Sequence, residues 1–106
     1  MTPVPKTNER RDAALTEAHR LSGDLLLLTD DRAGAETSFT DAIAVARRQV
    51  ARLFELRATT SLARLWRDQG KCAQARGLLA PIYGWFTEGF DTAELKEAKA
   101  LLDDLT

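Results

Sequence analysis

The chain has 106 residues, of which 44% are hydrophobic and 29% are charged, and its formal net charge is −1. A chain of this length fits one domain with a modest core, and its abundance of Ala, Leu, Arg and Glu favours helices over strands. The longest apolar run, Leu25–Leu28, is far shorter than the roughly 20 residues that span a bilayer, which argues against a membrane protein. The polar N-terminus lacks the apolar stretch of a secretory signal. The single cysteine, Cys72, cannot form an internal disulfide, so a cytoplasmic location is predicted.

The first two predicted helices follow an N-terminal tail at residues 1–7 that we expect to be disordered. The first helix is predicted from about residue 8 to residue 28, with an apolar face at helical spacing that consists of Leu15, Ala18, Leu21, Leu25 and Leu28. A turn follows, in which Asp30 or Asp31 is a suitable N-cap. The second helix is predicted at residues 33–50, and its buried face consists of Phe39, Ala42, Ile43, Ala46 and Val50.

The third and fourth predicted helices are separated by Gly70, which suits the left-handed residue that ends a helix. The third is predicted at residues 53–69, with a wide apolar stripe that includes Phe54, Ala58, Leu62, Leu65 and Trp66. No glycine or proline separates it from the second helix, so a merged helix stays open. The fourth starts near Cys72 and buries Ala75, Leu78, Leu79 and Ile82. Because the ring of Pro81 would clash with the carbonyl of Gly77, this helix is expected to be kinked but continuous.

Four of the seven aromatic residues fall within eight positions: Tyr83, Trp85, Phe86 and Phe90. They have two interpretations, as packing that fastens the last helix or as an exposed binding hot spot. The sequence at 91–94 resembles a capping box. It opens a last helix with the apolar face Leu95, Ala98, Leu102 and Leu105 and an acidic outer side.

The two helix pairs are related by an internal repeat. Moved forty residues along the chain, Gly23 falls on Ala63, Leu26 on Trp66, Ala35 on Ala75, Phe39 on Leu79 and Ala42 on Ile82. The small residues permit close helix approach, and the large ones fill the space between successive pairs. This pattern predicts two stacked helix pairs closed by a short final helix.

This order of small and large residues resembles the tetratricopeptide repeat. The resemblance implies an all-α fold, a right-handed solenoid of antiparallel helix pairs in a single domain at 8–106. Repeat one would cover about 8–50, repeat two about 53–87, and a capping helix about 92–105. The chain departs from the family in its period of forty, in the missing proline after the second helix, and in having Asp30 where the second repeat has Gly70.

Three segments carry a closer resemblance: AETSFTDAIAVARRQ, ELRATTSLARLWRDQGKCAQARGLLAPIYGWFTEGF and DTAELKEAKALLDDL. They resemble the C-terminal end of large bacterial signalling proteins that join a class III adenylate/guanylate cyclase or regulatory domain to an ATPase module. The resemblance implies the terminal piece of a helical-repeat array. No cyclase or nucleotide-binding motif is present, so no catalytic role is implied for any residue.

Charge is unevenly distributed along the chain, with eight basic against three acidic residues between Asp41 and Arg76. In repeats of this type the first helix of each pair lines the concave groove. The predicted partner-binding groove therefore consists of Glu17, Arg20, Asp24, Arg57, Thr60, Arg64 and Arg67. Arginines at this spacing suit an acidic peptide or a carboxylate, and the alternative is a solvated charged surface.

No catalytic, cofactor or metal site is predicted. The glycines do not form a phosphate-binding loop, and the only histidine, His19, is interpreted as a surface residue. Cys72 has no second cysteine or adjacent base to support a redox or nucleophilic role. The adjacent pairs Asp30–Asp31 and Asp103–Asp104 are interpreted as caps or solvated charges. Nucleic acid is disfavoured as a partner by the net charge.

The sequence thus predicts a non-enzymatic protein–protein interaction module that binds an acidic partner or itself. The alternative is a regulatory, ligand-sensing fragment of a cyclase- or ATPase-type signalling system. Because a solenoid usually needs about three repeats to bury its core, the first helix pair should expose Leu25, Leu26 or Leu28. We therefore predict a homodimer in isolation, or docking onto an upstream repeat in a longer chain.

Overall fold

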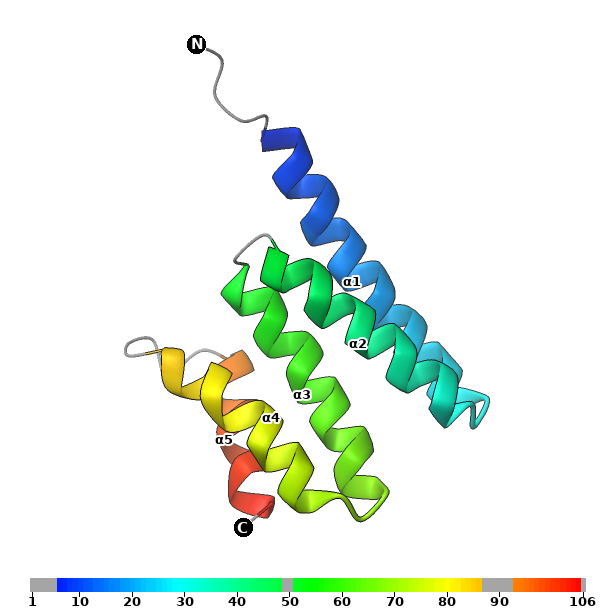
Figure 1. The fold of residues 1–106 in the computed structure, drawn as a ribbon, viewed down its shortest axis with the longest axis vertical. Helices are drawn as coiled ribbons and strands as arrows, with labels where there is room; N and C mark the ends of the chain where they lie inside the picture. The colour runs from blue at the N-terminus through cyan, green and yellow to red at the C-terminus, as the bar shows by residue number, and fades with distance from the viewer. Residues whose placement is uncertain (1–5, 49–50, 87–92, 106) are drawn as a thin grey trace.

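A computed structural model describes residues 6–48, 51–86 and 93–105, with side chains from Ala14 onwards. These residues form five α-helices and no strands (Figure 1): α1 (Lys6–Leu28), α2 (Arg32–Arg48), α3 (Arg52–Asp68), α4 (Cys72–Trp85) and α5 (Ala93–Asp104). The predicted all-α class is confirmed. None of these helices combines the length and the apolar character that crossing a membrane requires.

The helices are arranged as two antiparallel pairs and a single final helix. α1 lies beside α2, and α3 lies beside α4 (Figure 1). α3 also packs against both helices of the first pair, and α5 packs against both helices of the second. α5 is therefore placed on the second pair as α3 is placed on the first.

The turns within the two pairs have matching backbone geometry. Asp30 and Gly70, forty residues apart, have φ angles of 63° and 80°. The amide of Asp31 donates to the carbonyl of Leu26 at 2.8 Å, and the amide of Lys71 donates to that of Trp66 at the same distance. The first turn therefore takes the left-handed conformation without a glycine, which aspartate tolerates better than most residues.

The start of α2 confirms one of the two predicted caps. The carboxylate of Asp31 accepts a hydrogen bond from the backbone amide of Gly34 at 3.0 Å, so Asp31 is the N-cap. Ala51 has φ −90° and ψ 79°, which is not helical. α2 and α3 are therefore separate helices, and the open question of a merged helix is resolved.

Two clusters of buried side chains meet on α3. The α2–α3 cluster consists of Ala35, Phe39, Ala42, Ile43, Ala58, Leu62 and Leu65. The α3–α5 cluster consists of Leu56, Ala63, Ala75, Leu79, Ile82, Leu95, Ala98, Leu101 and Leu105. Trp66 packs against both clusters, so the two helix pairs share a continuous apolar interior.

Within each pair, the two helices pack against each other at equivalent positions. The ring of Phe39 lies so close to Gly23 that a Cβ there would be 2.5 Å from a ring carbon. In the second pair the equivalent residues, Ala63 and Leu79, belong to one cluster. A small residue on the first helix thus accommodates a large one on the second, as the forty-residue repeat predicts.

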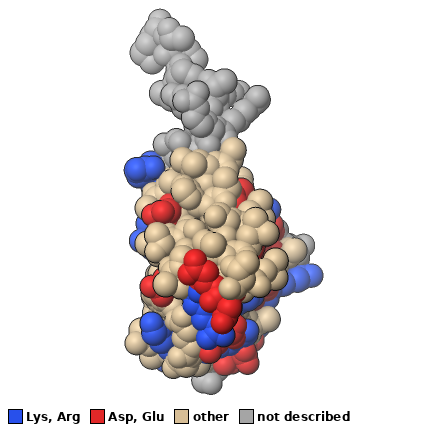
Figure 2. Space-filling view, turned by 90° about the vertical axis from the view of Figure 1, so that its right-hand side faces the viewer, with Lys and Arg blue, Asp and Glu red and all other residues tan. Residues whose placement is uncertain are grey.

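The apolar face predicted for α1 does not pack against the described chain, which confirms the predicted exposure of Leu25 and Leu28. Leu15, Ala18, Leu21, Leu25 and Leu28 are all exposed, and Leu25 and Leu28 are 64% and 82% exposed. Instead α1 contacts the rest of the chain through a neighbouring face that includes the buried Thr16 and Gly23. Gly23 explains the difference, because its missing side chain lets Phe39 approach this face of the helix. Figure 2 shows the result, a broad uncharged surface on the side where α1 lies.

The remaining boundaries differ from the predictions by at most two residues. α1 begins at Lys6, so two residues of the predicted 1–7 tail are helical, and residues 1–5 lie outside the described residues. α4 continues through Pro81 to Trp85, as expected for a helix that the proline does not stop. Val50, Phe90 and the first two residues of the predicted capping box at 91–94 also lie outside the described residues.

Candidate functional site

The arginines of α3 line one surface of the molecule. Arg57, Arg64 and Arg67 recur at intervals that place them on one side of the helix, and all three are half-buried. We call these three residues the arginine face. Thr60, between them, is buried, and its hydroxyl donates to the carbonyl of Leu56 at 2.7 Å. The Thr60 hydroxyl is therefore hydrogen-bonded within the helix, and the residue lines the surface between the arginines.

α5 lies on the arginine face with its carboxylates. Arg57 donates to Glu94 at 2.8 Å, Arg64 forms an ion pair with Glu97, and Arg67 donates to Asp104 at 2.9 Å. The pairs run in the same order along both helices, so α3 and α5 are parallel. The predicted acidic side of α5 is exposed at Glu97 and Asp104, and together with Glu94 these residues face α3. They do so because Leu95, Ala98 and Leu101 hold α5 against the second helix pair.

α1 adds a smaller charged group beside the arginine face. Arg20 donates to Glu17 at 2.9 Å and to Asp24 at 3.4 Å within α1. Arg57 donates to the same Glu17 at 3.0 Å across to α1. Arg57 therefore joins α1 to α5 through two carboxylates. All seven predicted groove residues lie on α1 or α3. Six of them take part in the ion pairs of this surface, and the seventh, Thr60, lies among them.

The ion pairs shift the pKa values of their members in opposite senses. The hydrogen bond from Arg57 lowers the pKa of Glu94, and its counterpart from Glu94 raises the pKa of Arg57. Partial burial opposes ionisation of Glu17, but Arg20 and Arg57 outweigh it, and its pKa is lowered. Burial and then repulsion from Arg67 lower the pKa of Arg64. Arg64 nevertheless has an acidic partner, because it forms an ion pair with Glu97 of α5.

A cavity of about 210 Å³ opens between α1, α3 and α5. It is lined by Arg20, Arg57, Thr60, Ser61, Arg64, Ala93, Glu94 and Glu97. Guanidinium groups from two helices thus meet carboxylates from a third around one hollow. Such a hollow can hold a carboxylate side chain or a small anion between Arg20 and Arg64. Its volume is below the roughly 300 Å³ at which pockets for drug-sized ligands begin.

Sequence reasoning missed the carboxylates of α5 as part of this site. The three pairs join residues 33 to 37 positions apart, and no local spacing reveals such a partner. The forty-residue repeat carried a usable signal. Had α5 been treated as the first helix of a third pair, its carboxylates would have been placed opposite the arginines of α3.

A second charged group surrounds Glu55, which is buried. Arg47 donates to its carboxylate at 3.0 Å and Arg52 at 3.4 Å. The guanidinium of Arg52 also lies 5.0 Å from the centre of the Trp85 ring. This group joins the ends of α2, α3 and α4, and its buried carboxylate is neutralised from two sides. It is best explained as a structural contact.

The aromatic residues divide between the two interpretations. Tyr83 and Phe86 pack against the α3–α5 cluster, which agrees with a role in fastening the last helix. Trp85 is 54% exposed and touches Phe86 edge-on, with ring centres 5.2 Å apart. The cluster is thus partly core and partly surface in the described residues.

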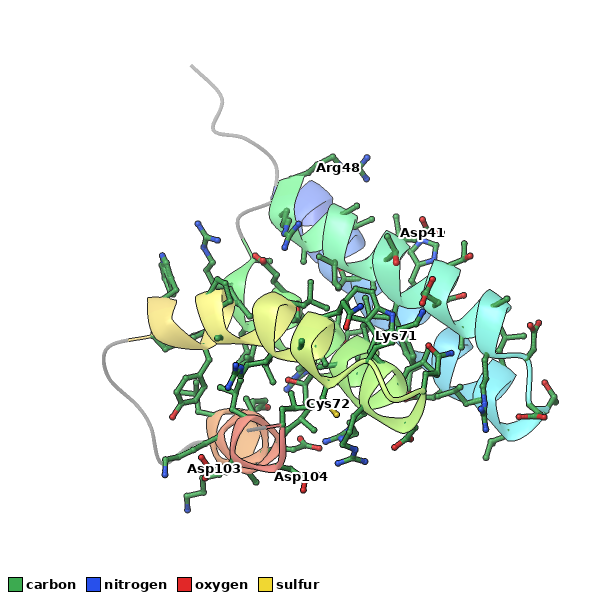
Figure 3. All side chains as sticks on the ribbon, turned by 60° about the horizontal axis from the view of Figure 1, so that its bottom comes forward. Asp41, Arg48, Lys71, Cys72, Asp103 and Asp104 are labelled. Atoms are coloured by element: carbon green, nitrogen blue, oxygen red, sulfur yellow. The ribbon has the colours of Figure 1, made fainter. Side chains whose placement is uncertain are left out.

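Among the described residues, the other chemically reactive side chains do not assemble a site. Cys72 packs against the α3–α5 cluster at the start of α4, and Asp103 and Asp104 lie together at the end of α5 (Figure 3). Asp103 pairs with Lys99 at 3.9 Å, whereas Asp104 pairs with Arg67. His19 is half-buried on α1. Within the described part of the chain, no three His, Cys, Asp or Glu residues are grouped to hold a metal ion.

No protein-family model, no curated protein and no solved structure matches the chain.

Proposed function

We propose that this chain is a non-enzymatic interaction module of the tetratricopeptide type, which binds an acidic segment of a protein partner. Two features support the fold part of the proposal. The two turns have matching hydrogen bonds at forty-residue spacing, and α5 is placed on the second pair as α3 is placed on the first. Helix pairs that repeat in this way stack into a solenoid whose first helices line one surface.

The binding part of the proposal rests on one observation: the arginine face already holds an acidic helix. Glu94, Glu97 and Asp104 of α5 occupy its three arginines in order. A surface that accepts three carboxylates from one helix offers the charge and spacing that a second acidic segment needs. We infer that the partner adds a carboxylate in the cavity that Arg20 and Arg64 line together.

The charge of the arginine face favours an acidic segment of a protein. The cavity of about 210 Å³ has room for one carboxylate side chain, and a second hollow of about 540 Å³ on the same face is lined by residues that include Arg64, Arg67 and Asp104. Because arginines of α3 line both hollows, we prefer an acidic segment that follows this face to a small ligand in one pocket. The resemblance to cyclase- and ATPase-linked bacterial signalling proteins suggests a cytoplasmic signalling setting.

The test measures binding of a synthetic glutamate-rich helical peptide to the full chain by fluorescence anisotropy. Arg64→Glu/Arg67→Glu should abolish binding, because it replaces two attractive charges with repulsive ones. The matched control is Arg48→Glu/Arg76→Glu, which makes the same change of charge on exposed residues of α2 and α4. Circular dichroism checks that both variants stay helical.

A third variant separates binding from a purely internal role of the arginines. Glu97→Gln removes the carboxylate of α5 that competes for Arg64. If the arginine face binds acidic segments, this variant should bind the peptide more tightly than the wild type. Equal weak binding by the wild type, Glu97→Gln and both double variants would show that the arginines serve only to hold α5.

A further inference from the structure

The outward face of α1 is apolar from Ala14 to Leu28, the part of the helix whose side chains are described. Seven exposed residues form it, and none is charged: Ala14, Leu15, Ala18, Leu21, Ser22, Leu25 and Leu28. Within them, Ala14, Ala18, Leu21, Leu25 and Leu28 follow one another at alternating intervals of four and three. That spacing forms a straight seam on a helix, the pattern by which one helix packs against another. At about 1.5 Å per residue the seam is about 21 Å long.

The equivalent face of α3 is buried by the preceding helix pair. Forty residues after Ala18, Ser22 and Leu25 come Ala58, Leu62 and Leu65, which all belong to the α2–α3 cluster. The same positions are thus a packing surface in α3 and lie open in α1. The seam is therefore built for a helical neighbour that the described chain does not supply.

Head-to-tail stacking of a second copy does not supply that neighbour. The surface of the first pair that receives a following helix is filled by α3, and that of the second pair is filled by α5. Beyond α5, the outward residues include Lys96, Lys99 and Asp103, which are exposed and charged. A leucine seam placed there would bury these charges, at a cost that outweighs the apolar contact.

The sizes of the seam residues suit pairing of α1 with α1 of a second copy. The seam is small at its N-terminal end, with Ala14 and Ala18, and large at its C-terminal end, with Leu21 and Leu25. Two such helices that cross antiparallel place each alanine opposite a leucine of the other copy. Facing positions that alternate small and large pack closely without voids, and a two-fold axis makes the same contacts twice.

We propose that the chain forms a two-fold homodimer through antiparallel pairing of α1 with α1 of a second copy, with Ala14 opposite Leu25 and Ala18 opposite Leu21. The acidic residues beside the seam do not oppose it. Glu17 and Asp24 are both paired with Arg20 within the same chain. A seam of about 21 Å is short beside a standard interface of about 800 Å² per partner, so the dimer should dissociate on dilution.

The first test is sedimentation velocity of the full chain over a wide range of concentration. The wild type should pass from monomer to dimer, and Leu21→Glu should raise the dimer dissociation constant about a hundredfold or more, because two buried leucines are lost. The matched control is Leu53→Glu, which changes an exposed leucine of α3 outside the seam and should leave the constant unchanged. A wild type that stays monomeric at every concentration overturns the proposal.

The second test reports the direction of the two helices. In a Cys72→Ala background, an Ala14→Cys chain mixed with a Leu25→Cys chain should form a disulfide-linked dimer under mild oxidation. Leu25→Cys alone should not, because antiparallel pairing keeps the two copies of that position far apart. Efficient cross-linking of Leu25→Cys with itself indicates parallel helices and overturns the proposed pairing. This seam and the arginine face use different residues, so the failure of either proposal leaves the other standing.

Discussion

The outer faces of the two end helices differ in character: that of α5 is charged and that of α1 is apolar. α5 buries its leucines against the second pair and turns Lys96, Lys99 and Asp103 outward. α1 turns Leu21, Leu25 and Leu28 outward. Burying the charges of α5 under a further helix would be costly, whereas the leucines of α1 would gain from a helical neighbour.

The same comparison shows where charged side chains orient one helix on another. Three carboxylates of α5, those of Glu94, Glu97 and Asp104, pair with the arginine face. These pairs favour one direction and one register of α5 along α3. Salt bridges at the surface stabilise little, but they favour one arrangement over others. α5 is thus held by leucines and oriented by charge, whereas the outer face of α1 presents leucines without an orienting charge.

The largest expected effect separates the leucines of the two ends. Leu101 of α5 is 4% exposed and Leu25 of α1 is 64% exposed. Leu101→Ala should lower the free energy of unfolding by about 2–5 kcal/mol, because it removes buried carbons and leaves a cavity. Leu25→Ala should change it by less than about 0.5 kcal/mol when measured at concentrations where the chain is monomeric. Urea denaturation of both variants measures the difference, and similar losses for the two would refute the assignment of inner and outer faces.

The second prediction compares the interlock in the two helix pairs. A methyl group at Gly23 would meet three carbons of the Phe39 ring at 2.5–2.9 Å, and that ring is fully buried. Gly23→Ala should therefore destabilise the chain by about 1–2 kcal/mol, since the strain of overpacking outweighs the gain in helix propensity. Adding Phe39→Leu recreates the Ala–Leu combination of the second pair and should recover part of the loss.

Thermal unfolding of the single and double variants measures this coupling. Gly77→Ala is the matched control, because a Cβ at Gly77 of α4 would meet nothing within 4 Å. It should stabilise the chain by about 0.5–1 kcal/mol, as alanine usually does in place of glycine within a helix. Equal effects of Gly23→Ala and Gly77→Ala would mean that Phe39 does not pack against α1.

The sequence predicted the fold well where a local pattern is compatible with only one structure. Helical spacing identified the buried face of α2, where Phe39, Ala42 and Ile43 are all buried. Gly70 marked the end of α3 because its φ of 80° suits glycine. These features depend on residues near one another in the chain, so local physical rules determine them.

For α1 the sequence predicted the exposure of Leu25 and Leu28 but did not identify the face that packs against α2. The leucine stripe was the stronger apolar signal, yet Phe39 packs on the face that contains Gly23. Periodicity measures how apolar a face is and does not identify its neighbour. The groove residues were placed on the correct helices, but their partners Glu94, Glu97 and Asp104 come from a helix more than thirty residues away. Pairing at that distance follows from the stacking of helices, which spacing alone does not encode.

The smallest expected effect concerns how charge orients α5. The pKa of Glu94 is lowered below its ordinary value of 4.5 by Arg57, so its ion pair stabilises the folded state above that value. This stabilisation is lost as the pH falls through the lowered pKa of the folded chain. The free energy of unfolding of the wild type should exceed that of Glu94→Gln by about 0.2–1 kcal/mol at neutral pH and by progressively less below pH 4.5. Since Glu17 shares Arg57, part of the acid effect should persist in Glu94→Gln and disappear only when Glu17→Gln is added. A difference between the wild type and Glu94→Gln that stays constant from pH 7 to pH 3 would show that Glu94 acts through packing, and the orienting role would then belong to the leucines of α5 alone.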